Sequence, residues 1–127
     1  MKILHTADWH IGKKLDHYSR LEEQREVLAE ICAIADENQV DAVVVAGDLF
    51  DNFSPSSEAT ELLYKTLHQL TANGTRAVIA IAGNHDSPDR IEVPDILAKM
   101  CGIIFIGFPN TVVTPFETPG GIKVTKT

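Results

Sequence analysis

Three short apolar runs in this chain each end directly in a group of polar side chains. The clearest run covers residues 77–81 and leads into Gly83-Asn84-His85-Asp86. Five consecutive apolar residues, several of them β-branched, predict a strand that is buried on both faces, as in a parallel sheet. Ligands bind such sheets at the carboxyl ends of the strands, so the turn after residue 81 predicts a functional site at this rim of the sheet.

Two other runs repeat the pattern. Residues 2–7 lead into Asp8 and His10, and residues 41–46 lead into Asp48. Asp8 and His10 are two residues apart, so on an extended strand end their side chains are expected to point to the same side. Three strand ends that each carry a carboxylate, an imidazole or an amide predict a metal site. Mixed nitrogen and oxygen ligands favour manganese, iron or zinc over calcium, which prefers oxygen ligands alone.

Helices are expected between these strands. A capping box formed by Ser19 and Glu22 predicts a helix that runs to about Glu37 and ends in a left-handed residue at Asn38. Its buried face is expected to hold Val27, Leu28, Ile31, Cys32, Ile34 and Ala35. The polar residues before it, 13–18, are expected to form a loop.

A second helix is predicted by an apolar stripe at helical spacing and by a stop at Asn73-Gly74. The stripe consists of Ala59, Leu62, Leu63, Leu67 and Leu70. A loop broken by Pro88 and Pro94, a short helix over residues 95–100 and a short strand over 103–106 follow. Strand–helix alternation with about 30 residues per unit predicts right-handed βαβ units and a mainly parallel α/β sheet. Prolines and glycines after residue 107 predict hairpin or edge strands.

Composition narrows the function classes only slightly. The 127 residues carry a formal net charge of −7, which does not favour non-specific attraction to nucleic acid. No apolar run reaches the roughly 18 residues of a membrane span, and the N-terminus has no signal-peptide layout. Cytoplasm is therefore the expected location, with no membrane partner. Cys32 and Cys101 lie among apolar residues and are expected to be buried, reduced thiols.

The other histidines and the single tryptophan favour structural roles. His5 lies within the first predicted strand and is expected in the core or at an interface. His17 and His68 are expected at the surface, the former beside the basic pair Lys13-Lys14. Trp9 is expected to pack beneath the candidate ligands.

Together, the D-x-H, G-D and G-N-H-D motifs at residues 8–10, 47–48 and 83–86 resemble those of the calcineurin-like metallophosphoesterases. Within that family, the opening run of residues 2–12 and the V-A-G-D-L-F-D run of residues 45–51 are most similar to the nuclease subunits of bacterial double-strand-break repair complexes. The resemblance covers residues 2–106.

This resemblance implies a layered αββα sandwich and a two-metal site, with Mn²⁺ as the expected ion. By similarity, Asp8 and His10 bind the first ion, Asp48 bridges both ions, and Asn84 binds the second. His85 is implied as the catalytic residue, which protonates the leaving oxygen or stabilises the transition state. The implied activity is exonucleolytic and endonucleolytic hydrolysis of DNA, by a homodimer that works with an SMC-like ATPase.

One part of the family pattern is absent. Members of the family supply three more histidine ligands from later loops, including a G-H-x-H motif, whereas this chain has no histidine after His85. Residues 1–127 are therefore expected to be the N-terminal part of a nuclease domain, without the C-terminal metal ligands and inactive alone. Asp8, Asp48 and Asp86 are expected to stand close together and repel one another.

Two alternatives to the nuclease stay open at this stage. The first is another phosphoesterase of the same family, a phosphatase or a cyclic-nucleotide phosphodiesterase. The second is a folded piece of protein that catalyses nothing.

Overall fold

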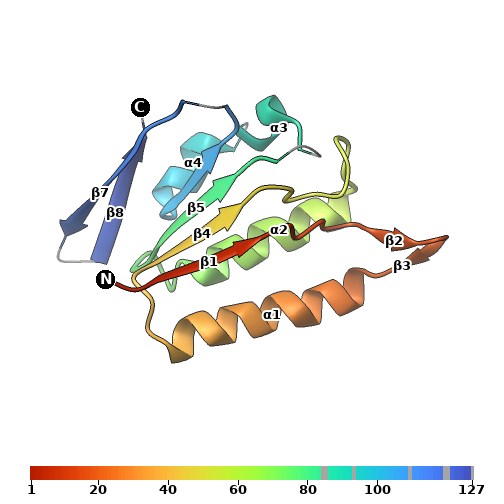
Figure 1. The fold of residues 1–127 in the computed structure, drawn as a ribbon, viewed down its shortest axis with the longest axis horizontal. Coiled ribbons are helices and arrows are strands. Elements are labelled where there is room, and N and C mark those ends of the chain that lie inside the picture. Colours follow the sequence, from red (N-terminus) through yellow and green to blue (C-terminus); the bar gives the residue numbers. More distant parts are fainter. Residues whose placement is uncertain (84–85, 93, 109, 119–120, 127) are drawn as a thin grey trace.

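The computed structural model describes residues 1–83, 86–92, 94–108, 110–118 and 121–126. Its centre is a parallel sheet in which the strands stand in the order β1-β4-β5-β6. These strands are β1 (Ile3–Ala7), β4 (Ala42–Ala46), β5 (Ala77–Ile81) and β6 (Ile103–Ile106) (Figure 1). The predicted α/β class and the mainly parallel sheet are confirmed.

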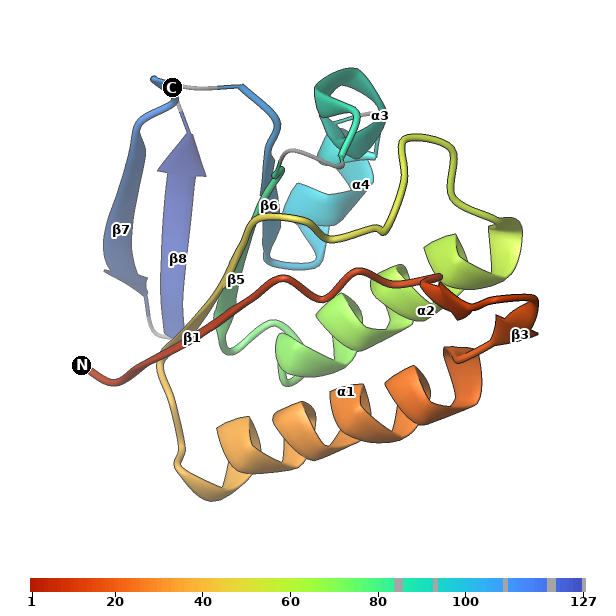
Figure 2. The ribbon, with the colours of Figure 1, turned by 45° about the vertical axis from the view of Figure 1, so that its right-hand side comes forward.

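Two long helices, α1 (Leu21–Glu37) and α2 (Ser57–Leu70), lie side by side along one face of the sheet (Figure 2). Two short ones, α3 (Pro88–Glu92) and α4 (Asp95–Met100), precede and contact β6. The predicted loop between residues 83 and 94 thus contains a helical turn that sequence analysis did not anticipate. Among the described residues, no helix is long and apolar enough to cross a membrane.

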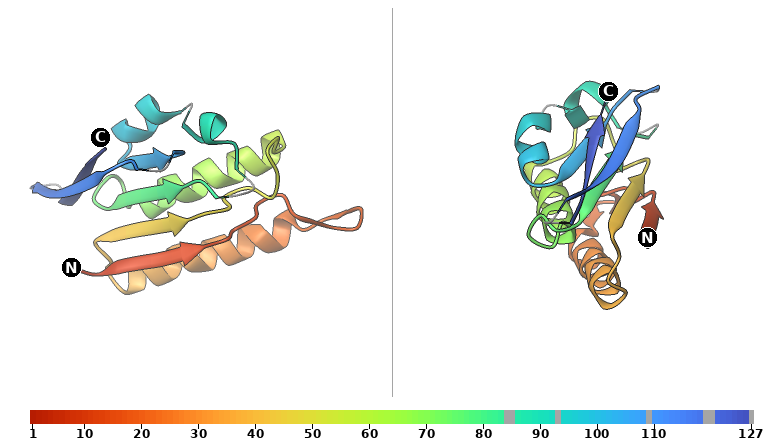
Figure 3. Two further views of the ribbon diagram at one scale, coloured as in Figure 1. Left: turned by 45° about the horizontal axis from the view of Figure 1, so that its top comes forward. Right: turned by 90° about the vertical axis from the view of Figure 1, so that its left-hand side faces the viewer.

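Two small antiparallel ribbons complete the fold. One pairs β7 (Val113–Thr118) with β8 (Gly121–Lys126) and lies near β5, in agreement with the predicted hairpin (Figure 3). The other pairs β2 (Lys14–Leu15) with β3 (Tyr18–Ser19). The expectation of a plain loop at residues 13–18 was wrong, because the chain turns back at Asp16 in a left-handed conformation (φ 54°).

The core lies between the sheet and the two long helices. Alternate strand residues point toward the helices and are almost fully excluded from water, namely Val43, Val45, Val78, Ala80 and Phe105. The predicted stripe on α2 is confirmed, since all five of its members are buried. His5 pairs with Val44, so its side chain points to the opposite face of the sheet from these core residues. Its side chain is exposed, so a core position for His5 was wrong.

Helix α1 departs from its sequence pattern at both ends. The N-cap is Arg20 and not Ser19, because Ser19 is paired with Lys14 in the short ribbon and lies one residue too early. Asn38 keeps a right-handed conformation (φ −88°), and the left-handed residue is Gln39 (φ 49°). The capping box and the left-handed conformation of Asn38 were therefore wrong, whereas the predicted end of the helix at Glu37 is confirmed.

The buried face of α1 is also narrower than predicted. Leu28, Cys32 and Ala35 are buried, whereas Val27 and Ile34 are 55% and 41% exposed. Burial, aided by the nearby Asp36 carboxylate, raises the pKa of the Cys32 thiol to about 11, so this thiol stays protonated. Cys101 is exposed, because it caps the short helix α4 at the surface, and its predicted burial was wrong.

Arg76, just before β5, holds the C-terminal ends of both long helices. Its side chain is only 7% exposed and donates to the carbonyl oxygens of Ala35, Val40 and Leu70. It also forms an ion pair with Asp36 at 3.1 Å. Cationic side chains at helix C-termini are favoured by the helix dipole, so Arg76 fixes α1 and α2 beneath the sheet that carries the candidate site.

Candidate metal centre

The candidate ligands lie where β1 and β4 end, and each of them has an unusual backbone conformation. Asp8, His10 and Asp48 have positive φ angles of 57°, 47° and 47°. Left-handed backbone is uncommon for residues other than glycine, and such positions concentrate at functional sites. Asp8 and His10 do not lie on an extended strand end, as their spacing predicts, because the backbone turns at both residues.

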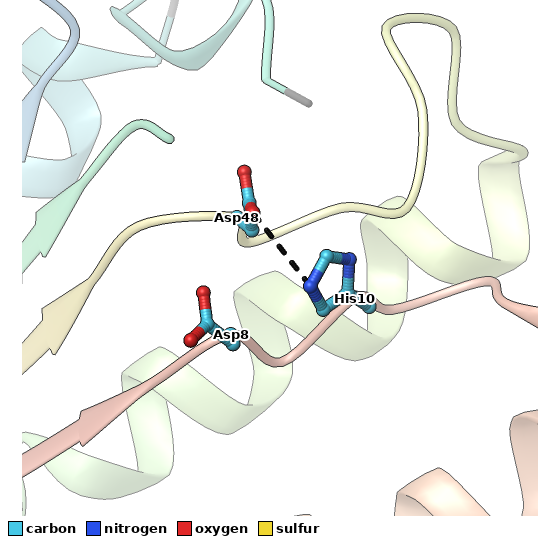
Figure 4. Close-up of side chains that lie close together, drawn as sticks. All are labelled: Asp8, His10 and Asp48. Atoms are coloured by element: carbon cyan, nitrogen blue, oxygen red, sulfur yellow. Dashed lines mark ion pairs between the residues drawn. The ribbon is translucent and has the colours of Figure 1, made fainter. Parts of the chain in front are cut away.

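The three side chains nevertheless converge. Asp8, His10 and Asp48 each offer one ligand atom, and these atoms all lie within 4.8 Å of one another (Figure 4). The His10 Nε2 atom is 3.6 Å from Asp48 Oδ2. The separation between His10 and Asp48 lies within the roughly 4.4 Å that two atoms bound to one ion at about 2.2 Å can span. Two carboxylates and one imidazole therefore form a group that can hold a divalent ion.

Asn84 and His85, the other two predicted site residues, lie outside the described residues. Asn84 as a ligand of a second ion and His85 as the catalytic residue stay predictions from the sequence.

The backbone next to these ligands extends the pairing of β1 with β4 beyond both strands. The amides of Asp8, His10 and Ile11 donate to the carbonyl oxygens of Gly47, Asp48 and Leu49 at 3.1, 2.9 and 3.0 Å. In return, the Asp51 amide donates to the Ile11 carbonyl at 3.1 Å. Because the two loops are hydrogen-bonded along their length, the ligands on one loop keep a fixed position relative to the ligand on the other.

A glutamine on α1 supports the same loop from below. Gln24 donates its amide to the His10 carbonyl oxygen at 2.9 Å and accepts a hydrogen bond from the Gly12 N–H at 3.0 Å. Trp9, between the two ligands, is half-buried against the core and donates its indole N–H to the Thr6 hydroxyl. This agrees with the packing role predicted for Trp9.

Asp86 has a different role from the one that sequence analysis gave it. Its carboxylate is buried and accepts three backbone hydrogen bonds, from Leu49, Phe50 and Gly83, each at 2.8 Å. Three N–H donors thus offset the charge of Asp86, a stabilisation that the sequence does not predict. Asp86 instead ties the Asp48 loop to the turn at Gly83.

Gly83 allows these two segments to approach closely. A Cβ atom at this position would overlap the backbone nitrogen and the carboxylate of Asp48. No larger residue fits between β5 and the ligand loop without displacing Asp48. Gly83 and the buried carboxylate of Asp86 thus maintain the same contact, which joins the turn after β5 to the loop that carries Asp48.

Comparison with known proteins identifies the family to which the chain belongs. The family model for calcineurin-like phosphoesterases matches residues 1–124. The chain belongs to the calcineurin-like phosphoesterase family. Because these phosphoesterases are metal-dependent, the group formed by Asp8, His10 and Asp48 is a candidate site for a divalent ion within a family that uses such ions.

Among curated proteins, this calcineurin-like phosphoesterase is similar to the SbcD subunit of nuclease SbcCD from several bacteria, which confirms the resemblance to a nuclease subunit. The Bacillus subtilis protein is 47% identical over 119 residues, which cover 94% of this chain and 30% of the relative. The Rhodobacter capsulatus protein is 42% identical over 125 residues, 98% of this chain and 29% of the relative. The chain thus spans less than a third of the length of these relatives.

We expect Asp86→Ala to lower the free energy of unfolding of the chain by about 3 kcal/mol or more, because three buried N–H groups lose a charged acceptor. Asp86→Asn, which keeps one acceptor oxygen, should lose less. Urea unfolding followed by circular dichroism measures both changes. Asp89→Ala, in which an exposed carboxylate of α3 is removed, is the control and should change stability by no more than about 0.5 kcal/mol. An Asp86→Ala variant as stable as this control would contradict the role of Asp86.

Proposed function

We propose that the whole protein of which this chain is a part is a metal-dependent nuclease that hydrolyses phosphodiester bonds in DNA, with exonuclease and endonuclease activity. One observation carries the proposal. The D-x-H and G-D motifs bring Asp8, His10 and Asp48 together in a chain that is 47% identical to a nuclease subunit. The carboxylate and imidazole donors fit a divalent ion such as Mn²⁺.

In this proposal four residues bind the metal ions and His85 acts on the phosphate. Asp8 and His10 hold one ion, Asp48 holds that ion and a second one, and Asn84 contributes an amide oxygen to the second. Bound divalent ions lower the pKa of a water molecule and offset the charge of the phosphate. His85 donates a proton to the leaving oxygen, or stabilises the negative charge that develops on the phosphate.

Residues 1–127 are, in the same proposal, the N-terminal part of the nuclease domain. The second ion has only Asp48 and Asn84 from this chain, so its remaining ligands come from another segment of the whole protein. The exposed sheet face that carries His5 suits the second layer of an αββα sandwich. The chain alone holds one ion and does not cleave DNA.

The proposed partners follow from the relatives. The name SbcCD belongs to a complex of two subunits, and we infer an SbcC-type, SMC-like ATPase as the partner of this protein. DNA double-strand-break repair and recombination are the proposed processes, and the cytoplasm is the proposed location. A phosphatase or cyclic-nucleotide phosphodiesterase of the same family would instead prefer p-nitrophenyl phosphate esters to DNA, and assays on both substrates separate these functions.

A homodimer is part of the proposal, and α4 offers a surface for it. Ile96, Leu97 and Met100 are 80%, 70% and 80% exposed on this six-residue helix. They lie next to an apolar pocket lined by Tyr64, Leu97 and Phe105, among others. Large apolar side chains that are this exposed and this close together are typical of a protein interface, and we assign this one to a second copy of the protein.

Metal titration tests the site and its ligand count. By calorimetry, the chain should bind one Mn²⁺ with micromolar to millimolar affinity, and Asp48→Ala should abolish this binding, whereas Asp89→Ala should leave it unchanged. The chain alone should leave linear duplex DNA intact. Two tightly bound ions, or strong cleavage by the chain alone, would contradict the proposed ligand set.

In the whole protein, His85→Ala should reduce nuclease activity by about 10²–10⁴-fold while sparing metal binding. Loss of metal by this variant would reassign His85 as a ligand.

Sedimentation velocity of the whole protein tests the dimer surface. Leu97→Glu should convert a dimer to a monomer, because the charge would be buried without a partner in the interface. Val27→Glu is the matched control, since Val27 is a similarly exposed apolar residue on α1. A Leu97→Glu protein that stays dimeric would place the interface elsewhere.

A further inference from the structure

Most basic side chains of this chain are bound by other groups of the protein. Eight of the 11 lysine and arginine side chains donate a hydrogen bond or form an ion pair within the part of the chain that the structure describes. Among the same described residues, the side chains of Lys13, Lys14 and Arg90 have no such partner. Acidic residues outnumber basic ones by 18 to 11, so a shortage of acids does not explain these three unpaired cations.

The three unpaired cations lie at the carboxyl rim of the sheet. Lys13 and Lys14 follow the loop of β1, and the Lys13 amide donates to the His10 carbonyl oxygen at 3.1 Å. Arg90 lies on α3, which follows β5. The β2–β3 ribbon, which begins at Lys14, and α3 both stand at the end of the sheet to which its strands point (Figure 1). Because β4 lies between β1 and β5, unpaired positive charge follows both neighbours of the strand that presents Asp48.

We propose that Lys13, Lys14 and Arg90 bind backbone phosphates of duplex DNA on either side of the phosphodiester at the candidate metal centre. Lysine and arginine contacts to phosphates hold a protein in position on DNA without reading its sequence. Arg90 suits this role because a guanidinium can donate two hydrogen bonds to one phosphate. The inference deepens the proposed function and rests on it, since it takes DNA as the substrate.

The surroundings of the three cations leave them available to a ligand. All three residues are exposed. Arg90 lines an open pocket of 480 Å³ together with Phe50, which follows Asp48 by two residues, so this cation stands close to the ligand loop. Asp16 and Asp89 are acidic neighbours in sequence, but within the described ranges neither forms an ion pair with these cations.

An acidic protein surface is another partner that unpaired cations can bind, and two observations favour DNA. The cations stand around a candidate metal centre in a family of phosphoesterases. Tyr18, on the same ribbon as Lys14, is 77% exposed, and exposed aromatic side chains among cations are typical of surfaces that bind nucleic acid. Binding of DNA is therefore expected to depend on these few cations and not on the net charge of −7.

The salt dependence of DNA binding by the whole protein tests the surface. Fluorescence anisotropy of a short labelled duplex, in EDTA and at several NaCl concentrations, measures affinity without metal-dependent cleavage. Each phosphate contact contributes about 0.9 to the slope of log K against log [salt]. The double variant Lys13→Gln/Lys14→Gln should therefore reduce this slope by about 1.8, and Arg90→Gln by about 0.9. Each lost contact should weaken binding about fivefold at about 0.15 M salt.

Lys65→Gln is the matched control. Lys65 is a lysine on α2 whose side chain is 75% exposed and paired with Glu61, so its replacement should change neither the affinity nor the slope. Rim variants that bind DNA with the wild-type affinity and slope would overturn the proposal. A loss of affinity at an unchanged slope would also overturn it, because the cations would then act on the fold and not on phosphate.

The acidic-protein alternative has its own outcome. If the rim variants lose salt-dependent binding of poly-glutamate but bind DNA as the wild type does, the cations bind an acidic protein and the proposal is wrong.

Cleavage and metal titration separate this inference from the proposed function. A wild-type protein that binds DNA through the three cations but does not cleave it with Mn²⁺ would contradict the proposed function and support the DNA-binding surface. A protein that cleaves DNA with Mn²⁺, and whose rim variants bind DNA with an unchanged slope, would contradict the surface and leave the proposed function standing. Calorimetry should give the same Mn²⁺ affinity for the wild type and the rim variants, because none of the three cations is a metal ligand.

Discussion

The candidate site depends on the buried carboxylate of Asp86. Three backbone N–H groups, from Leu49, Phe50 and Gly83, point at its two oxygens, and Asp86 as a whole residue is only 2% exposed. A buried charge is costly unless hydrogen bonds satisfy it, so the loop after β4 and the turn after β5 are held at one distance from each other. Gly83 makes the contact possible, because any side chain there would collide with Asp48.

Further contacts around the contact between Asp86 and the Asp48 loop complete the site. The parallel pairing of β1 with β4 continues into the loops, and the left-handed residues Asp8, His10 and Asp48 turn their side chains toward one another. Gln24 then supports the His10 backbone, and Asp51 faces the His10 ring. The buried sheet and the two long helices provide a rigid base, on which exposed loops carry the polar groups. This division of labour is common in proteins whose function lies in loops on a stable scaffold.

Much of the scaffold could be predicted from the sequence, because buried parallel strands and amphipathic helices leave strong periodic patterns. The strand over residues 77–81 and the leucine stripe of α2 are examples. The errors arose where tertiary pairing overrides local preference. Ser19 matches a capping box, but its pairing in the β2–β3 ribbon moves the N-cap to Arg20. Cys101 has apolar neighbours in sequence, yet α4 is too short and too peripheral to bury it.

The candidate site, like the scaffold, could be predicted from the sequence only in part. The motifs identify Asp8, His10 and Asp48, but they carry no information on the left-handed backbone that brings these residues together. The sequence predicts only that Asp86 stands close to Asp8 and Asp48, and it does not predict the hydrogen bond from Leu49, 37 residues away in sequence, to the Asp86 carboxylate. Gln24 lies 14 residues after His10 and gives no local signal for its bond to the His10 carbonyl. Such contacts become visible only when the fold is known.

The central claim is that Asp8, His10 and Asp48 hold one divalent ion at the carboxyl rim of the sheet. The most direct test is anomalous X-ray diffraction from crystals of this chain grown with Mn²⁺, recorded on both sides of the manganese edge. The account predicts one strong anomalous peak about 2.0–2.3 Å from a carboxylate oxygen of Asp8, Nε2 of His10 and a carboxylate oxygen of Asp48. The absence of an anomalous peak at this rim at saturating Mn²⁺ would contradict the claim. An ion bound by Asp86 instead would also contradict it.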